Sequence, residues 1–202
     1  MMIAAKVDYI SPEEYLALEE KSPVKHEYID GQIYAMSGTT DPHNTIAGNL
    51  FSLLKNHVRG KGCRVFFTDV KARIESRNLY YYPDVMVTCD PRDRELPLFK
   101  RHPCLVVEVL SDSTEAFDRG DKFADYRQLE SLQEYVLINQ KRQQVECFRR
   151  NAEGLWVLHA FEGGDAVDFA SVNFRIEVAE LYEDVDLSNP SNSFDRSIAP
   201  AA

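Results

Sequence analysis

The sequence lacks the cysteine patterns of small disulfide-stabilised or zinc-binding domains. Its 202 residues include four cysteines, none of them in a Cys-x-x-Cys pair: Cys63, Cys89, Cys104 and Cys147. Structural zinc sites usually draw on such pairs, and disulfide frameworks are typical of short secreted chains. We therefore expect four free, buried thiols in a reducing compartment, and no zinc site.

Long apolar runs are also missing. No window approaches the roughly 20 apolar residues of a membrane helix, and the first residues, MMIAAKVD, lack the apolar core of a signal peptide. These absences favour a cytoplasmic protein without membrane contact. Hydrophobic residues make up 44% of the chain, which suits one domain over residues 1–185. Residues 186–202, rich in Ser, Asn, Pro and Ala, are expected to be disordered.

An excess of positive charge is absent as well. The chain has 33 acidic and 23 basic residues, for a net charge of −10. Proteins that bind nucleic acids usually carry a basic surface, so the total charge counts against a nuclease, and a polyanion would have to meet a local patch. The candidate patch is Lys55, Arg59, Lys61 and Arg64, although most such runs are only solvated surface.

The order of the predicted elements indicates an α/β fold. Ser11-Pro12 is typical of a helix start, Asp30-Gly31 of a tight hairpin, and Asp41-Pro42 of a second helix start. The remaining predicted elements are strands at 64–70, 71–75, 79–88 and 104–110, a charged loop at 90–103, a helix at 118–129, a strand at 134–139, a hairpin of 143–149 with 155–161, and a helical turn at 178–182.

Two of these strands carry a carboxylate that their sequences do not explain. Asp84 lies between Tyr80-Tyr-Tyr-Pro83 and an apolar run, and Glu108 interrupts Leu-Val-Val-Glu-Val-Leu. A buried carboxylate is costly without a partner, and consecutive strands usually pair. We expect the two to share a divalent cation such as Mg²⁺. Lys122, on the following helix, would then be the partner of an attacking water or of a developing negative charge.

Several of these residues resemble the Uma2 family, which belongs to the PD-(D/E)xK nuclease superfamily. The matching motifs are Pro83-Asp84, Glu108-Val-Leu-Ser111 and Asp118-Arg-Gly-Asp-Lys122 with Tyr126; further matches are Glu27-Tyr-Ile-Asp-Gly31, Met36, His43 and Asp69-Val-Lys-Ala-Arg73. The resemblance covers about residues 11–150. The superfamily's motif places a lysine two residues after the acid, where this chain has Leu110, and Lys122 would fill that gap.

The resemblance implies a restriction endonuclease-like fold, a central mixed β-sheet flanked by helices. It also implies an Mg²⁺-dependent endonuclease of DNA, with Mn²⁺ as an alternative ion, and a homodimer. In this interpretation Asp84, Glu108 and the backbone carbonyl of Val109 bind the metal, Glu27 supports it, and Lys122 is catalytic. Further candidate site residues are His43, near metal or phosphate, Asp69 and Tyr126.

Other interpretations of the same residues stay open. Glu27 could pair with Lys25 or a cross-strand neighbour, His43 could be a helix-start residue making a local hydrogen bond, and Asp69 could be a surface residue. Lys122 could be a solvated partner of Asp118, and Tyr126 could belong to the core. At the level of function, the same fold could be a binding module with a weak or inactive site. It could also be a metal hydrolase of small phosphoesters, which would need no basic groove and so suits the acidic charge.

Overall fold

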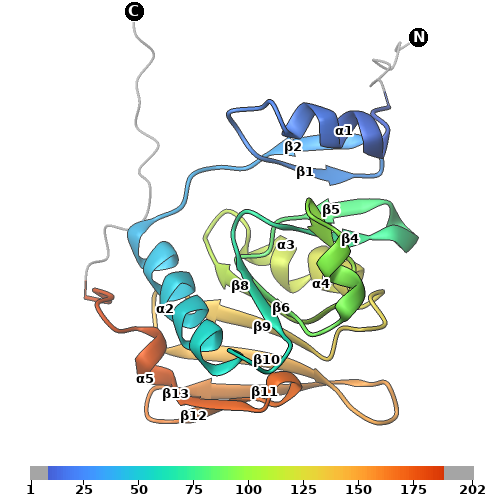
Figure 1. Ribbon diagram of the computed structural model, residues 1–202. Coiled ribbons are helices and arrows are strands. Elements are labelled where there is room, and N and C mark those ends of the chain that lie inside the picture. Colours follow the sequence, from blue (N-terminus) through green and yellow to red (C-terminus); the bar gives the residue numbers. More distant parts are fainter. Residues whose placement is uncertain (1–8, 189–202) are drawn as a thin grey trace, which may run out of the picture.

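The structure is a computed structural model that describes residues 9–188. Within this range the chain forms three β-sheets, of six, five and two strands. Figure 1 shows the six-stranded sheet in the body of the molecule, with the segment α1–β1–β2 above it. The tail predicted to be disordered falls outside the described residues from residue 189 onward.

The six-stranded sheet is mixed and runs in the order β11-β10-β9-β8-β6-β3. Its strands β8 and β9 are parallel, and its other neighbours are antiparallel. The strands are β3 (Arg64–Phe67), β6 (Val85–Thr88), β8 (Pro103–Leu110), β9 (Glu134–Asn139), β10 (Gln144–Arg150) and β11 (Trp156–Glu162). The predicted hairpin of 143–149 with 155–161 is therefore confirmed as β10–β11.

Helices cover both faces of this sheet. The helix α2 (Asp41–His57) packs Leu50 and Leu54 onto one face, against Val107 and its neighbours. The short helices α3 (Glu115–Arg119) and α4 (Asp121–Tyr126) cover the other face, where Phe123 meets Val106. Because side chains alternate along a strand, successive residues of β8 reach these two layers in turn. The predicted central mixed sheet flanked by helices is confirmed.

The five-stranded sheet has the order β2-β1-β5-β4-β7 and carries α1 (Pro12–Glu19). Tyr15 of α1 is buried against Tyr28 and Tyr80 of this sheet. The strands are β1 (His26–Ile29), β2 (Gln32–Ala35), β4 (Lys71–Ile74), β5 (Leu79–Tyr81) and β7 (Phe99–Lys100). The predicted helix start is confirmed, since Ser11 caps α1 in a capping box with Glu14.

The turn between β1 and β2 has the predicted conformation. Asp30 and Gly31 both have positive φ, 43° and 93°, as a type I′ turn requires. This turn keeps β1 antiparallel to β2, with Tyr28 opposite Ile33. Because side chains alternate along a strand, Glu27 points to the face of the sheet opposite to that of Tyr28.

Two predicted elements are each divided in the structure. The strand predicted at 79–88 is β5 and β6, which lie in different sheets, because Pro83 cannot donate a hydrogen bond within a ladder. The helix predicted at 118–129 breaks at Gly120 into α3 and α4. The loop predicted at 90–103 contains a 3₁₀ turn at Pro91–Glu95 and the strand β7.

The prediction of four free thiols is wrong. Cys63 and Cys89 form a disulfide, while Cys104 and Cys147 are free. Cys63 precedes β3 and Cys89 follows β6, and Arg64 lies opposite Thr88 in that antiparallel pair. The two cysteines are therefore brought together by strand register, which their separation of 26 residues does not reveal.

The C-terminal part of the described chain adds a small hairpin that the sequence pattern did not predict. It consists of β12 (Ala166–Phe169) and β13 (Phe174–Glu177), and the predicted helical turn follows as α5 (Val178–Leu181). Val167, Phe169 and Ile176 join the core on the α2 side. No helix between residues 9 and 188 is long and apolar enough to cross a membrane.

Candidate active site

The two unexplained carboxylates lie side by side at one end of the central sheet. Asp84 immediately precedes β6, which runs antiparallel to β8 with Val85 opposite Val107. The start of β6 therefore meets the end of β8, which carries Glu108. The Val109 amide donates to Asp84 Oδ2 at 2.8 Å, and the Asp84 amide lies 3.4 Å from Glu108 Oε2. Backbone contacts thus hold each carboxylate against the other strand.

Lys122 of α4 reaches into this group of acids. Its Nζ lies 3.0 Å from Glu108 Oε1, 3.2 Å from Glu27 Oε1 and 3.5 Å from Asp118 Oδ1. Only 6% of Lys122 and 3% of Glu108 is exposed to solvent, so the solvated-surface interpretation of Lys122 is wrong. Strand alternation turns Glu108 toward the α4 side of the sheet, and the burial of Phe123 and Tyr126 holds α4 there.

The charges in this group do not balance. One ammonium faces the carboxylates of Glu27, Glu108 and Asp118, and Asp84 is next to them. Burial raises the pKa of Glu108 well above its usual value, and the charges of Asp118 and Asp84 add to this while Lys122 opposes it. Burial would lower the pKa of Lys122, but Glu108 and Glu27 hold that pKa well above its usual value. The excess negative charge favours an additional cation.

Glu27 and His43 come from elements outside this pair of strands. Glu27 lies on β1 of the five-stranded sheet and accepts a 3.3 Å hydrogen bond from the Tyr82 amide. His43 lies in the first turn of α2, with Nε2 3.2 Å from Asp84 Oδ2. Lys25 pairs with Asp69 instead of Glu27. The group is therefore assembled by both sheets and by the helices α2, α3 and α4.

The other predicted site residues lie less centrally. Tyr126 is completely buried, with its ring 5.6 Å from that of Tyr81, as the core interpretation expects. Its hydroxyl has no hydrogen-bond partner among residues 9–188. Asp69 is exposed and paired with Lys25. Val109 contacts Asp84 through its amide, so ligation by its carbonyl stays a prediction.

Asp118 is the acid that the sequence analysis did not place in the site. It is 2% exposed, and burial raises its pKa. Its position four residues before Lys122 indicated contact, but that spacing is equally typical of a surface pair on a helix. The difference arises because α3 and α4 lie against the sheet, so that both side chains are buried beneath them.

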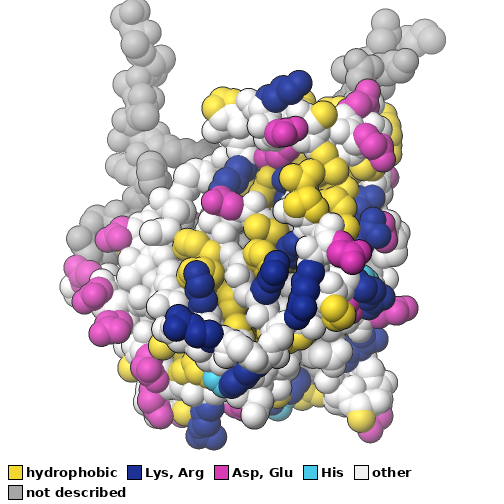
Figure 2. Space-filling view, in the orientation of Figure 1, with side chains coloured by type: hydrophobic (Ala, Val, Ile, Leu, Met, Phe, Trp, Pro, Cys, Tyr) yellow, Lys and Arg dark blue, Asp and Glu magenta, His cyan; other side chains and the backbone are white. Residues whose placement is uncertain are grey.

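The candidate basic patch lies toward the other end of α2. His43 and Lys55 are twelve positions apart on α2, or about 18 Å at the helical rise. Within the described chain, none of the four patch residues, Lys55, Arg59, Lys61 and Arg64, has a carboxylate within ion-pair distance. Figure 2 shows Lys and Arg gathered on the face over α2 and its neighbouring strands, with Asp and Glu along the left margin. The acidic chain therefore has a locally basic face.

The donor set fits a hard cation that completes its coordination with water and substrate. No three side chains of His, Cys, Asp or Glu among the described residues are grouped closely enough to hold a metal by themselves. Mg²⁺ commonly takes only one or two carboxylates, together with waters and phosphate oxygens. Asp84 and Glu108 supply two, and Glu108 Oε1 is buried without a hydrogen bond of good geometry. These two acids therefore suit such an ion.

A solved structure shares this fold over nearly its whole length. A crystal structure described as "a putative nuclease belonging to DUF820", from Anabaena variabilis, superposes with a TM-score of 0.70. The match covers 86% of this chain and 98% of that one, at 19% identity. At this identity the match establishes the fold, which is restriction endonuclease-like as predicted.

Sequence comparison then gives the family. The family model "Uma2: Putative restriction endonuclease" matches residues 12–179. Two Synechocystis proteins are similar along most of their length. "Uncharacterized protein slr1290" is 43% identical, and the match covers 86% of this chain and 91% of that protein. "Uncharacterized protein sll1609" is 34% identical, and the match covers 82% of this chain and 95% of that protein. The chain belongs to the Uma2 family, and the resemblance predicted from its motifs is confirmed.

Proposed function

We propose that this protein is an Mg²⁺-dependent endonuclease that hydrolyses phosphodiester bonds of DNA. The observation that carries the proposal is the buried Lys122 beside the paired carboxylates Asp84 and Glu108. A lysine buried among acids at the end of a sheet is poorly explained by stability, because well-packed apolar residues often replace such groups without loss. The family description and the nuclease fold support the same activity.

Asp84 and Glu108 would hold the metal ion. A bound Mg²⁺ polarises a phosphoryl oxygen and lowers the pKa of a coordinated water. Lys122 would donate a hydrogen bond to the attacking water or to the negative charge that develops on phosphorus-bound oxygens. Glu27 and Asp118 would keep the ammonium charged and in place. His43 would orient Asp84 or donate to a phosphate at the start of α2, where helix amides also favour anions.

A small-phosphoester hydrolase is the second candidate, and the net charge of −10 favours it. It would use the same acids but would not need the basic face. Turnover of mononucleotides and of simple phosphodiesters would then exceed that of DNA.

The two candidates are separated by one assay. Purified protein is incubated with supercoiled plasmid, single-stranded DNA or a mononucleotide, in Mg²⁺, Mn²⁺ or EDTA. We expect plasmid nicking in Mg²⁺ and Mn²⁺, none in EDTA, and no mononucleotide turnover. Metal-dependent turnover of the small substrate alone would support the second candidate. Metal binding by calorimetry without any turnover would indicate a binding module.

The basic patch gives a second prediction, on DNA binding. Replacing Lys61 and Arg64 by alanine should weaken binding of duplex DNA in Ca²⁺, because both side chains are exposed and lack acidic partners. If each contacts a phosphate, the slope of log affinity against log salt should fall by about 2. The control is the pair Lys21→Ala and Arg127→Ala, two exposed basic residues that follow α1 and α4 and lie outside this patch. Equal affinities and slopes in both double variants would rule out this patch as the DNA contact.

A further inference from the structure

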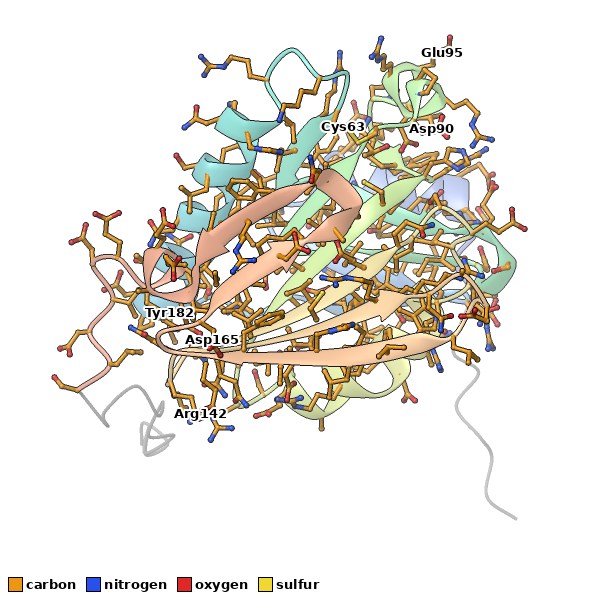
Figure 3. All side chains as sticks on the ribbon, turned by 90° about the horizontal axis from the view of Figure 1, so that it is seen from below. Cys63, Asp90, Glu95, Arg142, Asp165 and Tyr182 are labelled. Carbon is orange, nitrogen blue, oxygen red and sulfur yellow. A yellow bond between two sulfur atoms is a disulfide. The ribbon has the colours of Figure 1, made fainter. Side chains whose placement is uncertain are left out.

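Three sulfur atoms from neighbouring strands meet at the end of the central sheet that lies away from the carboxylates. Cys63 and Cys89 are joined across β3 and β6, and Cys104 lies on the next strand, β8. The Cys104 Sγ is 3.8 Å from the Cys89 Sγ. Figure 3 labels Cys63 beside the loop that carries Asp90 and Glu95. Cys89 thus touches two sulfurs, one bonded and one free.

The three cysteines differ in their access to solvent. Cys89 is exposed, whereas Cys63 and Cys104 are partly buried. The Cys104 thiol is turned inward, 3.4 Å from the Val87 carbonyl oxygen. Burial raises the pKa of the Cys104 thiol to about 11, so at neutral pH this thiol is protonated and a poor nucleophile. A dissolved thiolate therefore has the easier first access to the disulfide, at Cys89.

We propose that Cys63, Cys89 and Cys104 form a thiol–disulfide exchange site for a low-molecular-weight thiol such as glutathione. In the first step the dissolved thiolate attacks Cys89 Sγ; the Cys63–Cys89 bond breaks, a mixed disulfide forms on Cys89, and Cys63 leaves as a thiolate. In the second step Cys104 gives its proton to the Cys63 thiolate formed in the first step, and the Cys104 thiolate attacks Cys89 Sγ. The Cys89–Cys104 bond forms, and the dissolved thiolate is released. No net oxidation occurs, so no further oxidant is needed.

The exchange would change which strand is tied to Cys89. In the starting state the disulfide fastens β3, at the edge of the sheet, to β6. The turn before Cys63 contains Gly60 and Gly62, both with positive φ, and Arg94 donates a 3.2 Å hydrogen bond to the Gly62 carbonyl. After exchange the disulfide joins β6 to β8. The turn at residues 60–62, which includes Lys61, then loses its covalent tie to β6 and is held by its hydrogen bonds.

Peptide mapping tests the proposal, because trypsin places each cysteine on a different peptide. These are residues 62–64, 78–92, 102–119 and, for Cys147, 143–149. The protein is incubated with reduced glutathione below its own concentration, acid-quenched, blocked with maleimide and digested without reduction. We expect the Cys63–Cys89 link at time zero. The Cys89–Cys104 link should then appear, with blocked Cys63 in equal amount.

Two variants make the outcome decisive. In Cys104→Ser the second step is impossible, so the mixed disulfide of Cys89 with glutathione should accumulate well above its wild-type amount. Cys147→Ser removes the other free thiol, which is buried elsewhere in the core, and should behave as wild type. The proposal is overturned if wild type never yields the Cys89–Cys104 link, if Cys104→Ser and wild type hold equal mixed disulfide, or if native protein carries no Cys63–Cys89 link.

Discussion

Glu108→Gln should abolish metal-dependent DNA cleavage, with a fall of at least about 1000-fold in turnover. Glutamine keeps the size of the side chain and one acceptor oxygen but loses the charge that would bind the cation. Lys122 keeps Glu27 and Asp118 as partners in this variant. The fold should therefore survive, and circular dichroism should match that of wild type. The measurement is plasmid nicking in Mg²⁺ alongside metal binding by calorimetry.

The matched control for Glu108→Gln is Glu134→Gln on the adjacent parallel strand. Glu134 is also completely buried, but it lies opposite Leu105, toward the other end of β8. It accepts hydrogen bonds from Arg149 and from the Ala170 and Ser171 amides, so its role is structural. Below its unfolding temperature this control should cleave at near the wild-type rate. Cleavage by Glu108→Gln at the control's rate would remove Glu108 from the proposed mechanism.

The positions of these acids show which parts of the site the sequence could predict. Asp84 immediately precedes an apolar strand and Glu108 interrupts one. Because consecutive strands tend to pair, their proximity followed from local pattern. The contact of Lys122 with Glu27 did not follow, because it depends on how the five-stranded sheet meets α4. The chain passes from the five-stranded to the six-stranded sheet at Pro83, between β5 and β6, and so brings the five-stranded sheet close to α4. The sequence did not reveal this break, because strand-forming residues continue through it.

The disulfide shows the same limit. Uneven spacing argued against a zinc motif, but it carried no information on strand register. Register places Cys63 across from Cys89 and brings Cys104 next to Cys89. Register between strands that are distant in sequence depends on how α2 and several strands pack together. The helix cap at Ser11 and the turn at Asp30-Gly31 were predictable because they depend on only a few neighbouring residues.

Lys122→Met should destabilise the metal-free protein by about 3–5 kcal/mol, because it leaves buried carboxylates without their cation. Methionine is close in length and fills the space of the lysine stem, so lost packing contributes little. The measurement is urea unfolding in EDTA. The control is Lys141→Met, which removes an exposed ion pair with Asp112 and should cost no more than about 1 kcal/mol.

Acid should partly restore Lys122→Met. Burial raises the pKa of Glu108 in the folded state, and losing the ammonium raises this pKa further. A carboxyl group with a raised folded-state pKa stabilises the fold when protonated. That stability is present below its unfolded pKa, about 4.3, and is lost as the pH rises through the folded-state value. The stability deficit of Lys122→Met against wild type should therefore shrink as the pH is lowered from 8 toward 5.

The double variant Lys122→Met with Glu108→Gln separates charge from packing. If the destabilisation comes from the uncompensated carboxylate, removing the Glu108 charge should recover much of the lost free energy of unfolding, and the pH dependence should flatten. Simple addition of the two single effects would mean that Lys122 and Glu108 do not interact in the folded protein. Equal stability of Lys122→Met and Lys141→Met would contradict the buried charge cluster, and with it the physical basis for assigning this lysine to the active site.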